Sequence, residues 1–557
     1  MLRDSRIVSL LWPPEQPPEP GPSRLDAQTL LDDLDLREVI RALAGNDEQR
    51  EPFVTQLLQE MCAREEVIQY RQEVVADLLA HEALRERLDH VLDGLTELVQ
   101  DRELHFPSSW PVAQVAQRAS TLEHYVMVAV LLRDALQDEP VRSAGLQALR
   151  EKLRSLVADA WFQQLRQELP SLRATLDRVR SVTVGINFSP SFLPESAALL
   201  SIDSDGIEGR APFVERLFGK GGARGLSPLY DIDVTNPHNP LYREVLRLVE
   251  TAVAPVTQAL RGYTQVNAFA LNHLERELSF YLNAVALTRR LNDAGLPACQ
   301  PRIAPLEARV ARLEDAYNVT LALRLGAHKA DSVPAAVSLV TNAVAFDDAP
   351  ARLWILTGPN RGGKTTYIRA VGQAQVLFQA GLPVPARSGR LSPVDAIYTH
   401  FPLPEGTQVG MGRLDDEASR LAQIFQAATR QSLILLNEVL AGTSAFEAVA
   451  LAIDVVRGLR LLGVRAIYTT HLHELALRAD EINGTTPGDS RVGSLVAEVD
   501  AGGDGDDGAE HRRTFRIVPG PPRGSSYASD IAQRHGISFP HLVELFQRRG
   551  VLRHHTG

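Results

Sequence analysis

The sequence predicts a multidomain, mainly α-helical protein in which a helical region with a small β insertion precedes an α/β domain. Three observations support this fold class. The chain has 557 residues, and since domains of about 150 residues are common, three or four folding units are expected. Apolar residues recur at the helical period over much of the first part of the chain. Strand-like and helical segments alternate only from about residue 335 onward.

Composition and charge narrow the class of protein further. A content of 44% hydrophobic and 23% charged residues excludes a chain that is disordered throughout. The net charge is −11, so any contact with DNA would need a local basic surface. The 2 cysteines, Cys62 and Cys299, cannot form a disulfide framework and fit a reducing cytosol. The longest nearly uncharged apolar run, residues 125–132, is far shorter than the ~20 residues of a membrane span. We expect a cytoplasmic protein without a membrane segment.

The first 334 residues are predicted to form a lead-in and a helical region. Residues 1–25 are proline-rich and predict an extended lead-in. The region 26–334 is helical in pattern; within residues 53–79, for example, apolar side chains recur near the helical period. A β-rich stretch and a second apolar run predict a small β insertion at about 180–235. Its glycine-rich loop contains Lys220 and Arg224.

The remainder of the chain is predicted to form an α/β domain, residues 335–525, and a C-terminal helical segment, residues 526–557. Short apolar strands alternate with helical stretches in the α/β domain. The strands are expected at residues 353–357, 433–436 and 464–470, with an antiparallel pair near 493–500 and 513–518. The last helical pattern continues to about Arg548.

A glycine-rich loop follows the first of these strands and precedes a helix, and it fits the G-x4-G-K-[ST] phosphate-loop pattern. Its glycines allow backbone N–H groups to surround a β-phosphate, and the helix N-terminus favours an anion. Lys364 would neutralise phosphate oxygens, and the Thr365 hydroxyl suits a magnesium ligand. A glycine-rich turn with a chance lysine is the alternative. The loop and its next residue are Gly358, Pro359, Asn360, Arg361, Gly362, Gly363, Lys364, Thr365 and Thr366. ATP and Mg²⁺ are the cofactors that this pattern predicts.

Polar residues follow two further strands of the predicted sheet. Asn437 and Glu438 end one strand, where P-loop ATPases place a magnesium carboxylate and a water-polarising glutamate. Together with Thr365, both are candidate magnesium ligands. Because Asn437 is a neutral amide, it orients a magnesium-bound water less strongly than an aspartate does. His471 ends the next strand, in a place suited to sense a γ-phosphate. A histidine that is merely hydrogen-bonded at a strand end is the alternative.

Three segments, TGPNRGGKTTYIRAVG, LILLNEVLAGTSAFEAVALA and IYTTHLHEL, resemble in order and spacing the ATPase domain of the MutS family of DNA mismatch-repair proteins. The TGPN-x-GGKT loop and the E-x3-GTS segment are specific to that family. The resemblance covers roughly residues 335–548, and weaker similarity to the family's core and lever helices precedes it. It implies a core and lever domain with a clamp-like insertion, an ABC-type ATPase domain, and a C-terminal segment that pairs two subunits.

The resemblance also implies a mechanism. Two ATPase domains form a homodimer in which the partner completes each site, and ATP closes the dimer. Long helices then carry that closure to a DNA-facing clamp. By this resemblance the phosphate loop binds ATP and Mg²⁺, Glu438 polarises water and His471 reports the γ-phosphate. Lys220 and Arg224 are the best candidates for a contact with the DNA backbone, although a solvated loop is at least as good an interpretation.

The sequence departs from the family pattern at three places. Gly412 and Arg413 stand where the family's partner-facing signature has a serine–threonine pair. Asn437 replaces the expected aspartate. Leu339, in the segment that ends at Asn342, stands where the family has a phenylalanine that stacks on adenine. Arg413 could act in trans as an arginine finger, or it could pair with nearby carboxylates of its own helix.

Because core-like helices begin near the start of the sequence, we expect a protein without the family's mismatch-recognition and connector domains. We therefore expect an ATP-gated dimeric clamp that binds duplex or structured DNA, acts in repair or recombination, lacks direct mismatch readout and hydrolyses ATP slowly. The alternative is a nucleotide-gated scaffold with little or no ATPase activity. Asn437 and the Gly412–Arg413 pair favour the scaffold, whereas Lys364 and Glu438 oppose it. A transporter ATPase is disfavoured because an LSGGQ-like segment is missing from the sequence.

Overall fold

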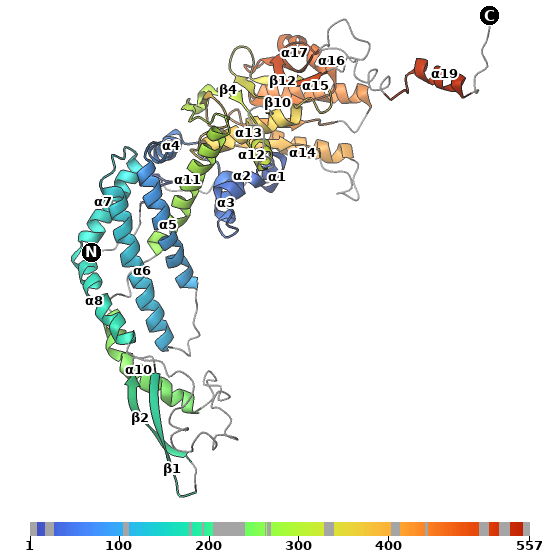
Figure 1. The fold of residues 1–557 in the computed structure, drawn as a ribbon. Helices are drawn as coiled ribbons and strands as arrows, with labels where there is room; N and C mark the ends of the chain where they lie inside the picture. Colours follow the sequence, from blue (N-terminus) through green and yellow to red (C-terminus); the bar gives the residue numbers. More distant parts are fainter. Residues whose placement is uncertain are drawn as a thin grey trace, which may run out of the picture. The chain divides into compact units, whose positions relative to one another are not determined.

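The computed structural model is rich in helices and contains mixed sheets (Figure 1). It divides into two compact units: Met1–Leu10 with Ala80–Ser279, and Leu11–Leu79 with Phe280–Gly557. Among the described helices, none combines the length and apolar character that a bilayer crossing requires. The residues that the structure describes are 8–16, 27–103, 111–177, 181–191, 194–203, 240–261, 263, 269–327, 339–402, 413–440, 444–500, 512–522 and 535–549.

The first unit is built around one long helix, α6 (Pro111–Gln137), which contacts four others. These are α5 (Glu82–Glu103), α7 (Ala144–Ala158), α8 (Ala160–Asp177) and α10 (Pro240–Arg261). The helix α11 (Phe269–Asp293) begins in this unit and ends in the second. The predicted β insertion contains the antiparallel hairpin of β1 (Ser181–Phe188) and β2 (Pro194–Asp203). The rest of the insertion, including Lys220 and Arg224, lies outside the described residues.

The second unit contains a six-stranded sheet in the order β12-β11-β6-β10-β9-β8. The five strands from β11 to β8 run parallel to one another, and β12 pairs antiparallel with β11 as the sequence predicts. Every residue of β6, β9 and β10 is buried, which explains why these strands are nearly continuous apolar runs. The strands are β6 (Leu353–Thr357), β8 (Ile397–His400), β9 (Leu433–Asn437), β10 (Arg465–Thr469), β11 (Val492–Asp500) and β12 (Arg512–Pro519).

Helices join these strands and position the site. Because β6, β9 and β10 are parallel neighbours, their carboxyl ends lie at one edge of the sheet, and so do the residues that follow them. The helices are α13 (Lys364–Gln379), α14 (Arg413–Ala427), α15 (Ala445–Leu462), α16 (His473–Leu477), α17 (Ala479–Thr485) and the final α19 (Phe539–Arg548). The last of these ends at Arg548, as the sequence pattern predicts.

A smaller four-stranded sheet lies in the same unit and was not foreseen from the sequence. Its order is β3-β7-β4-β5, and its strands are only 2 to 6 residues long. Such short strands carry too little alternation to stand out in a sequence. They are β3 (Arg302–Ile303), β4 (Ala311–Ala316), β5 (Asn342–Phe346) and β7 (Ser388–Leu391), with α12 (Val319–Ala327) after β4.

Four N-terminal helices also belong to the second unit: α1 (Ala27–Asp33), α2 (Arg37–Leu43), α3 (Glu51–Gln59) and α4 (Glu65–Ala80). The helical pattern over residues 53–79 is therefore interrupted, between Gln59 and Glu65. Met61 and Cys62 turn inward at this break and are buried. The side-chain amide of Gln379 on α13 donates to the Cys62 carbonyl at 3.0 Å. This tertiary hydrogen bond satisfies a carbonyl that would accept a helical hydrogen bond if the helix continued.

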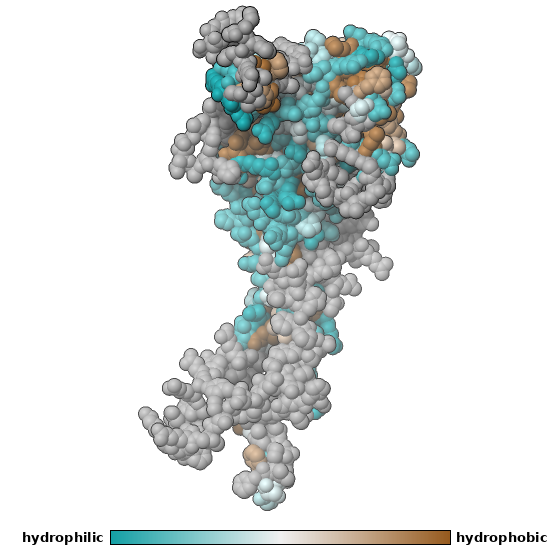
Figure 2. Space-filling model, turned by 90° about the vertical axis from the view of Figure 1, so that its right-hand side faces the viewer, coloured by the Kyte–Doolittle hydropathy of each residue, from teal (hydrophilic) through white to brown (hydrophobic). Residues whose placement is uncertain are grey.

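The described surface is mostly hydrophilic on the face shown in Figure 2, and hydrophobic residues occur there in limited patches. Both units bury apolar side chains in cores of their own.

The domain limits inferred from the sequence stay predictions. The residues Leu11–Leu79 group with the sheet-containing unit, so the N-terminal helices pack beside the α/β part.

Candidate functional site

The phosphate-loop sequence connects β6 to α13 and has the backbone that close ligand approach requires. Gly358 and Gly363 have φ values of +144° and +92°, a region that favours glycine. A Cβ atom at Gly358 would lie 2.6 Å from the Cβ of Ala497 on β11, so this position has no room for a side chain. Gly363 is the N-cap of α13 and supplies no side-chain acceptor to the first turn. The backbone N–H groups of that turn can therefore donate hydrogen bonds to an anionic ligand.

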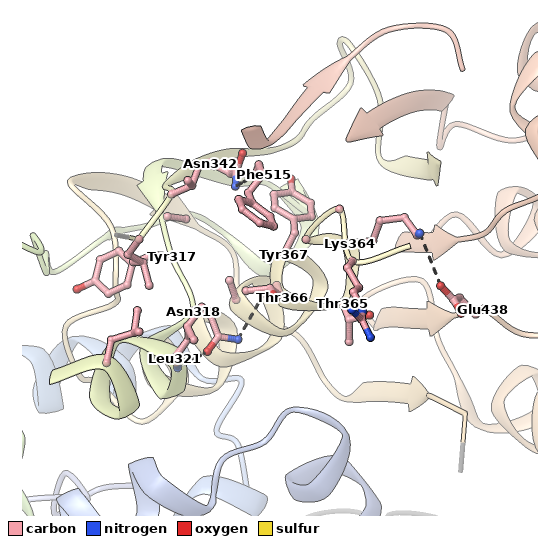
Figure 3. Close-up of a pocket in the computed structure, with 18 residues that line it drawn as sticks. Tyr317, Asn318, Leu321, Asn342, Lys364, Thr365, Thr366, Tyr367, Glu438 and Phe515 are labelled. Carbon is pink, nitrogen blue, oxygen red and sulfur yellow. Dashed lines mark hydrogen bonds and ion pairs between the residues drawn. The ribbon is translucent and has the colours of Figure 1, made fainter. Parts of the chain in front are cut away.

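Lys364 begins α13, and its side chain is buried. Its Nζ donates to the carbonyl oxygens of Gly358 at 3.0 Å and Pro359 at 3.1 Å. The same ammonium lies 3.6 Å from Oε1 of Glu438 (Figure 3). Burial lowers the pKa of Lys364, whereas the Glu438 carboxylate acts in the opposite direction. The loop thus holds a cation beside the N-terminus of α13.

Asn437 lies beside Thr365, where the sequence predicts a magnesium site. Its Oδ1 accepts a hydrogen bond from Thr469 Oγ1 at 2.7 Å and from Thr365 Oγ1 at 3.4 Å. Hydroxyl, amide and carboxylate oxygens fit Mg²⁺, which binds through few protein ligands together with substrate phosphates. Among the described residues, three or more His, Cys, Asp or Glu side chains do not gather as a metal site. The Thr365 hydroxyl, the Asn437 amide and the Glu438 carboxylate are the candidate oxygens for Mg²⁺ here.

Glu438 is held by contacts to its backbone and its side chain. Its amide donates to the Thr469 carbonyl at 3.0 Å, and its Oε1 lies 2.8 Å from Nε2 of His471. The hydrogen bond from His471 is the main influence that lowers the pKa of Glu438, and the charge of Lys364 adds to it against the opposing effect of burial. Its φ of +53° is unusual for a residue other than glycine, a strain of about 1–3 kcal/mol that is common at functional sites.

A cavity of about 450 Å³ brings nine of the predicted site residues together, and several of them are labelled in Figure 3. It is large enough for a small-molecule ligand. His471 is absent from its described lining and stands behind Glu438 instead. The predicted residues that line it are Leu339, Asn342, Arg361, Gly362, Gly363, Lys364, Thr365, Thr366 and Glu438.

Phe515 on β12 also lines this cavity, although it is not among the residues predicted from the sequence. Its φ is +57° and 45% of the side chain is exposed, although it is a large aromatic residue. The ring lies against the phosphate loop: a Cβ atom at Gly363 would be 3.6 Å from Phe515 Cδ1. Both ends of the Asn342 amide bind the same strand, by donation to the Phe515 carbonyl at 3.2 Å and acceptance from the Ile517 amide at 2.7 Å. Asn342 therefore supports Phe515.

The residues predicted to contact the partner subunit or DNA lie wholly or partly outside the described part of the structure. Gly412 lies outside the described residues, as do Lys220 and Arg224. Arg413 is the first residue of α14, but its side chain is outside the described part of the structure. The predictions for the trans site and for the DNA contact therefore stay predictions.

Comparison with known proteins gives two family matches and several relatives. The model of MutS domain V, an ATPase domain, matches residues 354–492, and that of the MutS2 N-terminal domain matches residues 63–294. The DNA mismatch repair protein MutS of Symbiobacterium thermophilum is 27% identical over 456 residues, which cover 77% of this chain and 50% of that protein. The protein of the same name from Oleidesulfovibrio alaskensis is 32% identical over 221 residues, 39% of this chain and 23% of that protein.

The chain thus spans half or less of the length of these relatives. A helical part that matches the MutS2 N-terminal domain, followed by an α/β part that matches MutS domain V, defines a multidomain protein with an ATPase-type domain. The chain belongs to the MutS family.

Proposed function

We propose that this protein is an ATP-dependent DNA-binding protein of MutS type, a homodimeric clamp that acts in the cytoplasm in DNA repair or recombination. Its proposed features are ATP gating, slow hydrolysis and no direct readout of mismatches. The observation that carries the proposal is the cavity in which a MutS domain V sequence gathers Lys364, Thr365 and Glu438 around a phosphate-loop backbone. ATP and Mg²⁺ are the proposed ligands.

Each residue of the site has a proposed task. The loop amides and Lys364 bind the β- and γ-phosphates, and the Thr365 hydroxyl and Asn437 would hold Mg²⁺. That ion, when bound, would neutralise charge on the phosphate oxygens. Glu438 orients and deprotonates the attacking water. His471, 2.8 Å from the Glu438 carboxylate, fixes its direction and keeps it ionised.

ATP is proposed to close a dimer of the α/β domains, with Gly412 and Arg413 at the N-terminus of α14 facing the partner. Lys220 and Arg224 in the β insertion are the proposed contacts to the DNA backbone.

The direct test is DNA binding by the full chain with and without ATP, at fixed salt because such binding depends strongly on ionic strength. Matched, mismatched, branched and single-stranded substrates should be compared. ATP should change the affinity, and mismatched and matched duplexes should bind within tenfold of each other. A larger preference for the mismatch, or no DNA binding in any state, would contradict the proposal.

Asn437 favours a second candidate, a nucleotide-gated scaffold that hydrolyses ATP scarcely or not at all. We expect Asn437→Asp to raise turnover several-fold while ATP remains bound. An aspartate oxygen could keep the hydrogen bonds from Thr365 and Thr469 and would add a negative charge to the magnesium shell. Steady-state phosphate release measures this, with Asn187→Asp on the exposed hairpin as the control. Turnover that stays flat or falls would show that another group holds the metal.

Phe515 offers a separate prediction about the nucleotide base. We expect Phe515→Leu to weaken ATP binding about tenfold, because stacking on an aromatic ring contributes ~1–3 kcal/mol per base. Binding of tripolyphosphate, which has no base, should be unchanged. Competition binding measures both ligands, and Phe188→Leu, at another exposed phenylalanine, is the matched control. Equal loss for both ligands would mean that Phe515 shapes the phosphate loop instead.

A further inference from the structure

The turn between α1 and α2, formed by Asp33, Leu34 and Asp35, contacts three helices whose N-terminal ends belong to the proposed site or adjoin it. We propose that Asp33 is a positioning residue that couples α13, the phosphate-loop helix, to α14, whose N-terminus is the proposed partner-facing element. This inference rests on the proposed function and adds a means of regulation to the same site.

The turn is seated on α13. The Nε of Arg369 donates to the Asp33 carbonyl at 2.8 Å, and the side-chain amide of Gln373 donates to the Leu34 carbonyl at 2.8 Å. Leu34 is fully buried and lies against Gly372, where an added Cβ would be 2.4 Å from its Cδ2. These contacts lie within about 15 Å of Lys364 along the same helix, at a rise of ~1.5 Å per residue. A shift of α13 on nucleotide binding would therefore reach the turn.

The carboxylate of Asp33 faces the other helix. Its Oδ2 lies 3.4 Å from Nη2 of Arg420 on α14, and the same nitrogen donates to the Thr399 carbonyl of β8 at 2.9 Å. Arg420 follows Arg413 by about two helical turns on α14. Asp33 is thus bound to α13 through its backbone and to α14 through its side chain. Because its carboxylate is largely buried, solvent weakens this ion pair less than an exposed one.

Asp35 provides a comparison within the same turn. Its carboxylate binds both terminal nitrogens of Arg324 on α12 at 2.8 Å, and its carbonyl accepts from Thr320 at 2.7 Å. Among the described contacts its carboxylate pairs with α12 and, at 3.9 Å, with Arg369 of α13, but not with α14. If Asp33 only stabilised the fold, its replacement would speed exchange with and without ATP alike and would leave the response of α14 to ATP intact. If Asp33 couples the helices, only its replacement should uncouple α14.

Hydrogen–deuterium exchange of the full chain, with and without ATP and magnesium, separates these cases. In the wild-type protein ATP should slow exchange in the first turns of α13 and also in α14. In Asp33→Asn the response of α13 should persist, while that of α14 should fall at least threefold. Arg420→Gln should do the same, and the double variant should be no worse than either single change, as expected for partners in one interaction. Asp35→Asn should keep the α14 response.

Turnover provides a second readout. Asp33→Asn should lower kcat without raising KM for ATP, because the phosphate loop itself is unchanged. A response of α14 in Asp33→Asn equal to the wild type, or an equal loss in Asp35→Asn, would overturn the inference. So would a wild-type protein in which ATP protects α13 but leaves α14 unchanged. Failure of ATP to protect α13 in the wild type would instead refute the proposed nucleotide site.

Discussion

Lys364→Ala should weaken nucleotide binding by roughly 10²–10⁴-fold, because two hydrogen bonds from a charged donor contribute ~1.5–3 kcal/mol each. Lys364 already lies in the place that this role requires. It is buried, begins the helix that follows the glycine loop, and donates to two loop carbonyls. A bound phosphate chain would take over those hydrogen bonds. Equilibrium binding of a fluorescent ATP analogue would measure the loss.

Two controls keep this result interpretable. Lys152→Ala removes a lysine from α7 in the other unit and should leave the affinity unchanged. Thermal unfolding should show that Lys364→Ala is folded, although Glu438 loses its cationic neighbour at 3.6 Å. Unchanged ATP affinity in a folded Lys364→Ala protein would refute the assignment of the phosphate loop.

The central part of the sheet could be predicted from the sequence because burial on both faces constrains its composition. β6, β9 and β10 are buried along their whole length and mostly apolar, and the residues of the site follow them in the sequence. The rule that parallel strands present their carboxyl ends at one edge then brings Lys364, Glu438 and His471 together. Their proximity follows from strand order, although the position of His471 behind Glu438 does not.

Other features depend on contacts between distant segments and leave little trace in the sequence. Phe515 reaches the cavity because the backbone of β12 turns to a positive φ there and Asn342 binds the Phe515 carbonyl and the Ile517 amide. The break before Glu65 depends on Gln379, which is far away in the chain. The same is true of Asp33, whose two partners lie on α13 and α14. Local periodicity cannot indicate such contacts.

The neighbours of Glu438 explain how its carboxylate can stay ionised although the side chain is partly buried. Burial alone would raise the pKa of Glu438, but the hydrogen bond from His471 and the charge of Lys364 lower it. A lowered pKa means that the carboxylate remains ionised as pH falls from neutral toward the usual carboxyl range. Activity that needs an ionised Glu438 should persist over that interval. His471→Ala removes the main influence that lowers the pKa of Glu438. The acid limb of this variant's pH–activity profile should therefore move to higher pH.

Glu438→Gln should lower ATP turnover by about 10²–10⁴-fold, the usual contribution of a general base, while ATP still binds. Glutamine has nearly the same shape and leaves Lys364 free to hold phosphate, but it cannot accept a proton from water. The expected result is unchanged ATP affinity with almost no phosphate release in a single-turnover experiment. The matched control is Glu474→Gln, which should turn over normally; Glu474 is an exposed glutamate on α16 that pairs with Arg478. Turnover near the wild-type rate in Glu438→Gln would show that another group activates the water.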